Sequence, residues 1–171
     1  MLFRSIYACV RTSATDGFTW NALASGTAFT GVTIVACSGT GRYFITGSLI
    51  TDSSTPSSYT QYISSDYGAT IVANNGLGSC AVYACSVSYT GQYMICVAGN
   101  TSKPKISSDF GGTWTTVTSL PPSLYYFGCA ISRTGNQVYI YSPYNVYTYS
   151  SNACTAPLVD RKSTRLNSSH T

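Results

Sequence analysis

Few residues of this chain could carry acid–base chemistry, and two of them lie in nearly identical surroundings. Asp109 lies in the stretch ISSDFGGTW at 106–114, and Asp66 lies in ISSDYGATI at 63–71. A carboxylate can transfer protons, bind a metal ion or accept hydrogen bonds from the backbone of a turn. Because one pattern recurs around both aspartates, we interpret them as parts of a repeated turn and not as catalytic acids or metal ligands.

The recurring pattern is S-x-D-x-G-x-T, and its residue types suit a tight turn between two antiparallel strands. We expect the aspartate to accept hydrogen bonds from N–H groups just ahead of it and the glycine to take a positive φ. A tryptophan after the threonine supplies a large apolar body that can pack against a neighbouring sheet. The predicted turn residues are Ser64, Asp66, Gly68 and Thr70 in one copy, and Ser107, Asp109, Gly111, Thr113 and Trp114 in the other.

The chain repeats with a period of about 43 residues. Asp66 and Asp109 are 43 residues apart, and a weaker copy of the turn, SATDGFTW, occupies 13–20. In this copy a threonine stands where the acid is expected, and Asp16, Gly17 and Trp20 complete the predicted turn. The interval to the next copy is longer, and the polar stretch TDSSTPSS at 51–58 is expected to be a surface insertion.

Pairs of apolar runs joined by a Thr-Gly turn recur between the copies, at 40–41, 90–91 and 134–135. The run QYMICVA at 92–98 is apolar almost throughout, as expected of a strand that is covered on both faces. Four short strands at a period near 43 are what the blades of a β-propeller require.

The S-x-D-x-G-x-T-W spacing resembles the Asp-box of the BNR repeat family, the hairpin-turn signature of sialidase-like β-propellers. The resemblance implies an all-β fold of four-stranded antiparallel blades joined by Asp-box turns. We count two complete units with a partial unit at each end, and therefore predict a partial, open β-propeller arc over residues 1–159. The blade joints are expected near 30, 78 and 124.

The segment DRKSTRLNSSH at 160–170 does not fit the repeat. It resembles the translated read-through of a common short-read sequencing adapter over eleven consecutive residues. We therefore expect 160–171 to be an unstructured tail and a sequencing artefact, and we expect the natural protein to continue beyond 159. The alternative is a basic tail that binds nucleic acid or an acidic membrane.

The composition excludes several classes of partner. Charged residues make up 8% of the chain, against about 25% in typical soluble domains. The formal net charge is +4, and without the tail nothing basic enough to follow a phosphate backbone remains, so no nucleic-acid partner is expected. No apolar run is long enough for a signal peptide or a membrane anchor, so no membrane partner is expected and the compartment stays open.

The seven cysteines lack C-x-x-C pairs, so the sequence predicts neither a metal site nor a cofactor site. Cys85 and Cys129 occupy the same position of the repeat, and we interpret them as small buried hydrophobes with free thiols. A disulfide between blades, or between Cys80 and Cys85, is the alternative. The aromatic residues between 125 and 149 are expected in blade interfaces more than in a ligand site.

Two functions remain open. Glycoside hydrolysis, which the sialidase resemblance implies, requires a pair of carboxylates, or a tyrosine nucleophile with a glutamate. Because Asp66 and Asp109 are assigned to turns and glutamate is absent, no catalytic residue can be assigned in this segment. We favour a non-catalytic recognition or scaffold propeller that binds a protein or a glycan through its loops. The alternative is a fragment of a sialidase-like glycoside hydrolase whose catalytic residues lie in blades outside this segment.

Overall fold

The fold is described from a computed structural model. The structure describes residues 7–10, 19–22, 32–48, 61–78, 80–98, 103–121, 125–143, 145–150 and 159–160; for 7–10, 19–22, 48, 149–150 and 159–160 it describes the backbone only. No helix in these ranges is long and apolar enough to cross a membrane. The expected insertion at 51–58 and residues 161–171 of the expected tail lie outside them.

Three four-stranded antiparallel sheets follow one another along the chain, each with its strands in sequence order. We call them the first, second and third blades. The first contains β3 (Val32–Cys37), β4 (Phe44–Ser48), β5 (Tyr62–Ser64) and β6 (Val72–Ala73). The second contains β7 (Val82–Val87), β8 (Met94–Ala98), β9 (Lys105–Ser107) and β10 (Thr115–Thr116). The third contains β11 (Gly128–Ile131), β12 (Gln137–Tyr141), β13 (Val146–Ser150) and β14 (Val159–Asp160).

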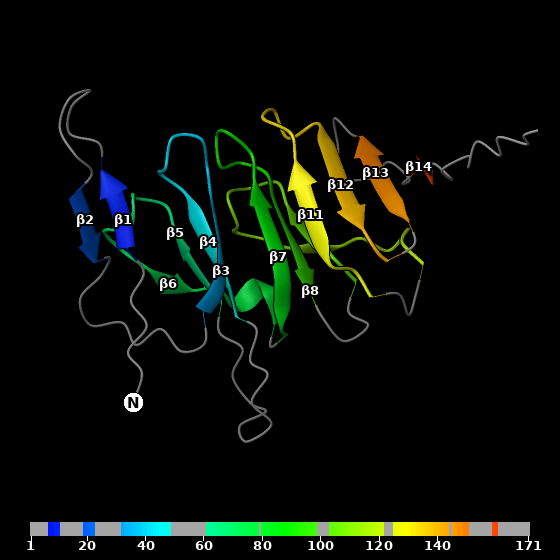
Figure 1. The fold of residues 1–171 in the computed structure, drawn as a ribbon, viewed down its shortest axis with the longest axis horizontal. Coiled ribbons are helices and arrows are strands. Elements are labelled where there is room, and N and C mark those ends of the chain that lie inside the picture. The colour runs from blue at the N-terminus through cyan, green and yellow to red at the C-terminus, as the bar shows by residue number, and fades with distance from the viewer. Residues whose placement is uncertain are drawn as a thin grey trace, which may run out of the picture.

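Figure 1 shows the blades side by side in chain order. The first strands of the second and third blades, β7 and β11, contact the blade before them. A separate two-stranded sheet pairs β1 (Tyr7–Val10) with β2 (Thr19–Ala22). The only regular helix in the described ranges is η1 (Asn75–Leu77), a single 3₁₀ turn between the first and second blades. The all-β fold of four-stranded antiparallel blades in an open arc is therefore confirmed.

The count of complete blades differs from the prediction. Three blades have four strands, whereas two complete units are expected from the pattern. The third blade is complete because β13 and β14 pair, although the residues between them do not follow the turn pattern. Strand pairing uses backbone groups, so it does not require the aspartate or the glycine of the turn. The hairpin that joins them is longer, with ten residues between the paired Thr148 and Val159 and eight between Ile106 and Thr115.

A second repeated turn joins the first two strands of each blade. In all three copies a serine hydroxyl accepts a hydrogen bond from the N–H five residues ahead, at 3.0–3.1 Å. The backbone N–H of the same serine donates to the carbonyl of that residue, at 2.8–2.9 Å. The serines are Ser38, Ser88 and Ser132, and each lies three residues before a glycine of positive φ: Gly41, Gly91 or Gly135.

The apolar core lies between the blades. One cluster joins the first and second blades and contains Ile45, Leu77, Val82 and Cys96, with Trp114 packed against it. A larger cluster joins the second and third blades and contains Ile95, Val97, Ile106, Val117, Leu120, Tyr126, Val138, Ile140 and Tyr147. All five residues of β8 are buried because this strand contributes alternate side chains to both clusters. Each blade is thus held by its neighbours and not by a core of its own.

Candidate functional site

The two turns that contain the aspartates, 64–70 and 107–113, have the same hydrogen bonds, and we call them the aspartate turns. In the first, the Thr70 N–H donates to Oδ1 of Asp66 at 2.9 Å, and the Thr70 hydroxyl donates to Oδ2 at 2.6 Å. The Ser64 hydroxyl donates to Oδ1 at 2.9 Å and accepts from the N–H of Gly68 at 2.9 Å. Both carboxylate oxygens of Asp66 are therefore occupied within the turn.

The second aspartate turn repeats this arrangement closely. The Thr113 N–H and hydroxyl donate to Asp109 at 2.8 and 2.7 Å, and the Ser107 hydroxyl donates at 2.8 Å. The glycines of the two turns, Gly68 and Gly111, have φ values of 85° and 86°. The geometry is that of a structural turn, in which the carboxylate replaces backbone acceptors that the reversing chain lacks.

The hydrogen bonds of the turns also lower the pKa values of both aspartates, which favours their charged form. The side-chain hydrogen bond from Thr70 is the largest cause that lowers the pKa of Asp66 below its ordinary value of 3.8. For Asp109, the backbone N–H of Thr113 is the largest cause that lowers the pKa. A general acid at neutral pH requires a raised pKa. The shift has the opposite sign here, so neither carboxyl group is suited to donate a proton.

Each aspartate turn presents one aromatic side chain to solvent at a strained position. Tyr67 and Phe110 have φ values of 62° and 60°, and the two residues are 62% and 42% exposed. Their N–H groups donate to the carbonyls of Arg42 and Gln92 at 3.0 Å in both cases. Each of these residues directly follows the glycine of the serine turn that joins the first two strands of the same blade, which we call the Ser-x-Thr-Gly turn. The two kinds of turn therefore lie together at one end of the blades.

Trp114, which follows the second aspartate turn, packs against the preceding blade. Its indole covers Gly76 in η1, where a Cβ would overlap the ring, and its N–H donates to the carbonyl of Gly111 at 3.1 Å. The ring therefore closes one end of the space between the first and second blades.

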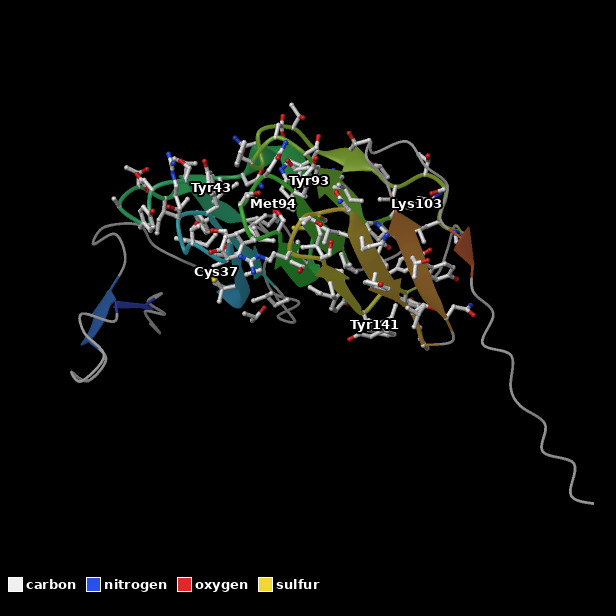
Figure 2. All side chains as sticks on the ribbon, turned by 90° about the horizontal axis from the view of Figure 1, so that it is seen from above. Cys37, Tyr43, Tyr93, Met94, Lys103 and Tyr141 are labelled. Carbon is white, nitrogen blue, oxygen red and sulfur yellow. The ribbon has the colours of Figure 1, made fainter. Side chains whose placement is uncertain are left out.

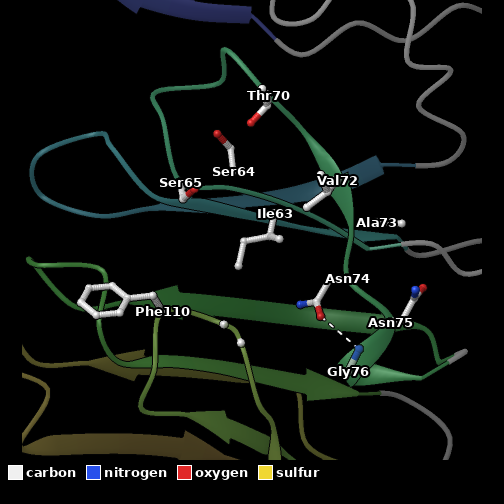
Figure 3. A pocket seen from close by; sticks show the side chains of 12 residues that line it. Ile63, Ser64, Ser65, Thr70, Val72, Ala73, Asn74, Asn75, Gly76 and Phe110 are labelled. Carbon is white, nitrogen blue, oxygen red and sulfur yellow. Dashed lines mark hydrogen bonds between the residues drawn. The ribbon is translucent and has the colours of Figure 1, made fainter.

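An open groove of about 470 Å³ lies in that space. Ile63 and Val72 of the first blade and Phe110 of the second give it apolar walls, and Ser65 and Thr70 add polar groups at one end. Figure 3 shows these side chains on the two facing segments, with Asn74 between them. The groove thus combines apolar side chains with about as many polar ones, so a ligand in it could make both apolar contacts and hydrogen bonds.

Asn74 is the buried polar group of this groove. Its side chain is only 7% exposed, and its Oδ1 accepts the N–H of Gly76 at 3.2 Å. Its Nδ2 is buried and has no hydrogen-bond partner. In Figure 3 this nitrogen points away from η1, toward the side of the groove where Ile63 and Phe110 lie. A buried amide donor without an acceptor is uncommon, because the lost hydrogen bonds to water are not replaced.

The structure brings together only part of the predicted set of turn residues. Asp16 and Gly17 lie outside the described residues, and Trp20 is described only by its backbone. Trp20 lies within β2, whereas the corresponding Trp114 precedes β10, so the strand register of the first hairpin differs from that of the aspartate turns.

No sequence pattern singles out Asn74. Asn74 and Asn75 are adjacent and chemically identical, and the hydrogen bond that distinguishes Asn74 depends on η1. The serines of the Ser-x-Thr-Gly turns were also missed, although their constant position three residues before the glycine was a usable signal.

Within the described residues, no three His, Cys, Asp or Glu side chains are grouped as a metal site would require. The described cysteines, Cys37, Cys80, Cys85, Cys96 and Cys129, are free thiols. The Sγ atoms of Cys85 and Cys96, on neighbouring strands, are 3.3 Å apart. Burial raises the pKa of the Cys96 thiol well above its ordinary value. Cys96 lies in the cluster between the first and second blades, and its thiol is not activated for chemistry.

Comparison with known proteins supports the fold and leaves the activity open. No family model matches the chain. No curated protein matches it either. An ancestral GH74 enzyme has 16% sequence identity and a TM-score of 0.56 over 75% of this chain and 18% of that chain. YCF48 bound to a D1 peptide has 14% identity and a TM-score of 0.55 over 75% of this chain and 41% of that chain.

A third solved structure, the β-propeller domain of Myceliophteria thermophila Cps50 (Swd1), has 13% identity and a TM-score of 0.55 over 76% of this chain and 38% of that chain. The chain therefore spans between about a fifth and two fifths of the length of these three solved chains. One of them is described as an enzyme and another as bound to a peptide. The resemblance establishes a β-propeller fold for this segment.

Proposed function

We propose that this chain is a segment of a non-catalytic recognition propeller and that it binds an extended peptide of a partner protein in the groove between the first and second blades. The observation that carries the proposal is the unpaired Nδ2 of the buried Asn74. Leaving such a donor without an acceptor costs about 1–3 kcal/mol. A carbonyl oxygen of a bound peptide would supply the missing acceptor, so the groove is arranged to favour a ligand of this kind.

The walls of the groove fit a peptide side chain. Val72 is 57% exposed and Phe110 is 42% exposed, which leaves apolar surface for a ligand to cover. β6, which contributes Val72 and Ala73, is the edge strand of the first blade. An edge strand can pair with an added strand through its backbone while side-chain pockets give specificity. Both features suit an extended chain with alternating apolar side chains.

The chemistry of the acidic residues favours binding over hydrolysis. Glycoside hydrolases of the usual kind need two carboxylates free to transfer protons or attack the sugar. Asp66 and Asp109 each accept hydrogen bonds at both oxygens inside their own turns, and the sequence contains no glutamate. The alternative remains a fragment of a glycoside hydrolase whose catalytic residues lie in other blades.

A propeller of similar fold gives a precedent for a peptide ligand, since the solved YCF48 structure contains a D1 peptide. The resemblance supports only the class of ligand that we propose.

The proposal is tested by exposing the labelled chain to an array of immobilised peptides and, in parallel, to an array of glycans. We expect retention on a subset of peptides that share apolar residues at alternate positions. Retention on glycans alone would overturn the choice of a peptide ligand. Hydrolysis of a fluorogenic sialoside or glucan by the chain would overturn the non-catalytic proposal.

The matched variant is Asn74→Asp, which keeps an oxygen for the Gly76 N–H and replaces the unpaired donor by an acceptor. We expect binding about tenfold weaker, as for the loss of one hydrogen bond. Asn136→Asp, an exposed asparagine in the third blade, is the control and should bind as the unmodified chain does.

A further inference from the structure

Two cysteines of the second blade face each other across neighbouring strands. Cys85 of β7 and Cys96 of β8 are register partners, and the pairs on either side of them follow the same regular register. Their Sγ atoms are 3.3 Å apart. This separation is shorter than the optimum of about 3.5–4.0 Å for two carbon atoms, which are smaller than sulfur. The two side chains therefore lie on the same face of the sheet with their sulfur atoms in direct contact.

The spacing of the two strands suits a disulfide. Directly opposed residues of antiparallel strands have Cα atoms about 4.5 or 5.5 Å apart, and disulfides span about 4.4–6.8 Å between Cα atoms. Bond formation shortens the sulfur–sulfur distance from 3.3 Å to about 2.05 Å. Small χ1 rotations of two side chains are enough for a movement of this size, so neither strand has to leave its register.

The other described thiols near this pair are directed at backbone carbonyls. Cys80 donates to the carbonyl of Leu77 in η1 at 3.5 Å. Cys129 of the third blade donates to the carbonyl of Ile95 at 4.0 Å. The geometry therefore favours a bond between Cys85 and Cys96 over the alternatives that the sequence left open, a bond between Cys80 and Cys85 or a bond between blades.

The two thiols of the pair differ in their access to solvent. Cys96 is 1% exposed and lies inside the cluster between the first and second blades, whereas Cys85 is half-buried at the edge of this cluster. Burial raises the pKa of the Cys96 thiol well above its ordinary value, so this thiol does not react first. A small oxidant meets Cys85 first, and the second step then joins two groups that already touch.

We propose that Cys85 and Cys96 form a reversible disulfide within the second blade, with a low-molecular-weight disulfide such as glutathione disulfide as the oxidant. The Cys85 thiolate attacks one sulfur of the small disulfide, breaks its S–S bond, forms a mixed disulfide and releases one small thiol. The Cys96 sulfur then attacks the Cys85 sulfur, and its proton passes to the second small thiolate as that leaves. Two protein thiols become one disulfide, and one small disulfide is reduced to two thiols.

The bond cross-links the blade that both interfaces share. β8 contributes buried side chains to both apolar clusters, so a link from β8 to β7 acts at the centre of the arc. A disulfide stabilises a fold mainly by restricting the unfolded chain, and we expect the midpoint of thermal unfolding to rise by roughly 5 °C on oxidation. The pair stays reduced in a reducing compartment and is linked in an oxidising one.

Peptide mapping after oxidation tests the proposal. The sample carries Cys37→Ser, because Cys37 is exposed and lies at the edge of the molecule in Figure 2, where it could link two chains. This sample is incubated with glutathione disulfide, alkylated in denaturant and digested with chymotrypsin, which cuts after Tyr89 and Tyr93, between the two cysteines. We expect the peptide with Cys85 to be joined to the peptide with Cys96, and dithiothreitol to separate them.

The mapping has clear contrary outcomes. A main product that links either cysteine to Cys80 or Cys129 would overturn the proposal. Glutathione that stays on Cys85 without a bond to Cys96 would overturn it as well, and so would full alkylation of both thiols after the incubation.

Cys80→Ala and Cys85→Ala are matched variants of the same sample, since both cysteines are half-buried and pack against the same cluster. Cys80→Ala should still form the bond and show the rise in thermal midpoint on oxidation. Cys85→Ala should show neither, and a rise of equal size in this variant would contradict the assignment. The mapping decides the question even where Cys85→Ala does not fold, because it needs no change at either cysteine. No peptide ligand is involved, so these outcomes are separate from the test of the proposed function.

Discussion

Gly111 of the second blade lies directly against Ile63 of the first, so close that a Cβ at position 111 would overlap Cδ1 of that isoleucine. The same glycine has a φ of 86°, which residues other than glycine rarely adopt. One residue therefore meets two requirements, the reversal of the chain within its own blade and the close approach of the blade before it.

Replacing Gly111 by alanine should destabilise the chain more than the same change at Gly41. Both positions have positive φ, but only position 111 has a neighbour that a methyl group would displace. We expect a loss of about 1 kcal/mol from the backbone at both sites and a further 1–3 kcal/mol, roughly, from overpacking at position 111. Urea unfolding of the two variants measures this difference, and equal losses would contradict the contact.

Replacing Asp109 by alanine should lower the free energy of unfolding by about 1–2 kcal/mol, since three hydrogen bonds of the turn lose their acceptor. Ser108→Ala, at the exposed position just before it, is the matched control and should change stability little. The comparison is made by chemical unfolding. A loss no larger than that of the control would show that the carboxylate does not hold the turn.

The aspartates should also make stability depend on pH in the acid range. Their pKa values are lowered in the folded chain, so their contribution is present above the ordinary value of 3.8 and is lost as the pH falls through the lower folded values. We expect the midpoint temperature of thermal unfolding to decrease when the pH is lowered below about 4. A variant with Asp66→Asn and Asp109→Asn should show a weaker fall, and an unchanged slope would contradict this assignment.

Thiol reactivity should follow burial. Cys37 is exposed, whereas burial raises the pKa of Cys96 and of Cys129 and so removes their thiolate form at neutral pH. Among the described cysteines, we expect an alkylating reagent to label Cys37 first and to label Cys96 and Cys129 only after denaturant is added. Peptide mapping by mass spectrometry gives the order. Rapid labelling of Cys96 in the native chain would show that the blade interface is open.

The sequence predicts the fold well where the determinants are local. Every hydrogen bond that the Asp66 and Asp109 carboxylates accept comes from a residue within four positions, so the S-x-D-x-G-x-T pattern contains most of the information needed for the turn. The hairpin of β13 and β14 in the third blade shows the limit of this reasoning, because these two strands pair through their backbones without that pattern. Counting only the patterned turns therefore gave too few complete blades.

The groove could not be predicted because its features depend on contacts between blades. Asn74 is buried where η1 meets the tryptophan of the next blade, and no local pattern separates it from Asn75. The tyrosines show the same limit. Tyr147 is buried in the interface with the second blade, whereas Tyr139 on the neighbouring strand is exposed, because the two rings lie on opposite faces of the same sheet.

The most direct test of recognition at the groove is calorimetric titration of the best-retained array peptide into the chain and into Asn74→Asp. We predict saturable one-to-one binding that the substitution weakens about tenfold, with the Asn136→Asp control unaffected. Equal affinity for the chain and for Asn74→Asp would contradict the account, because the buried amide would then take no part in holding the ligand.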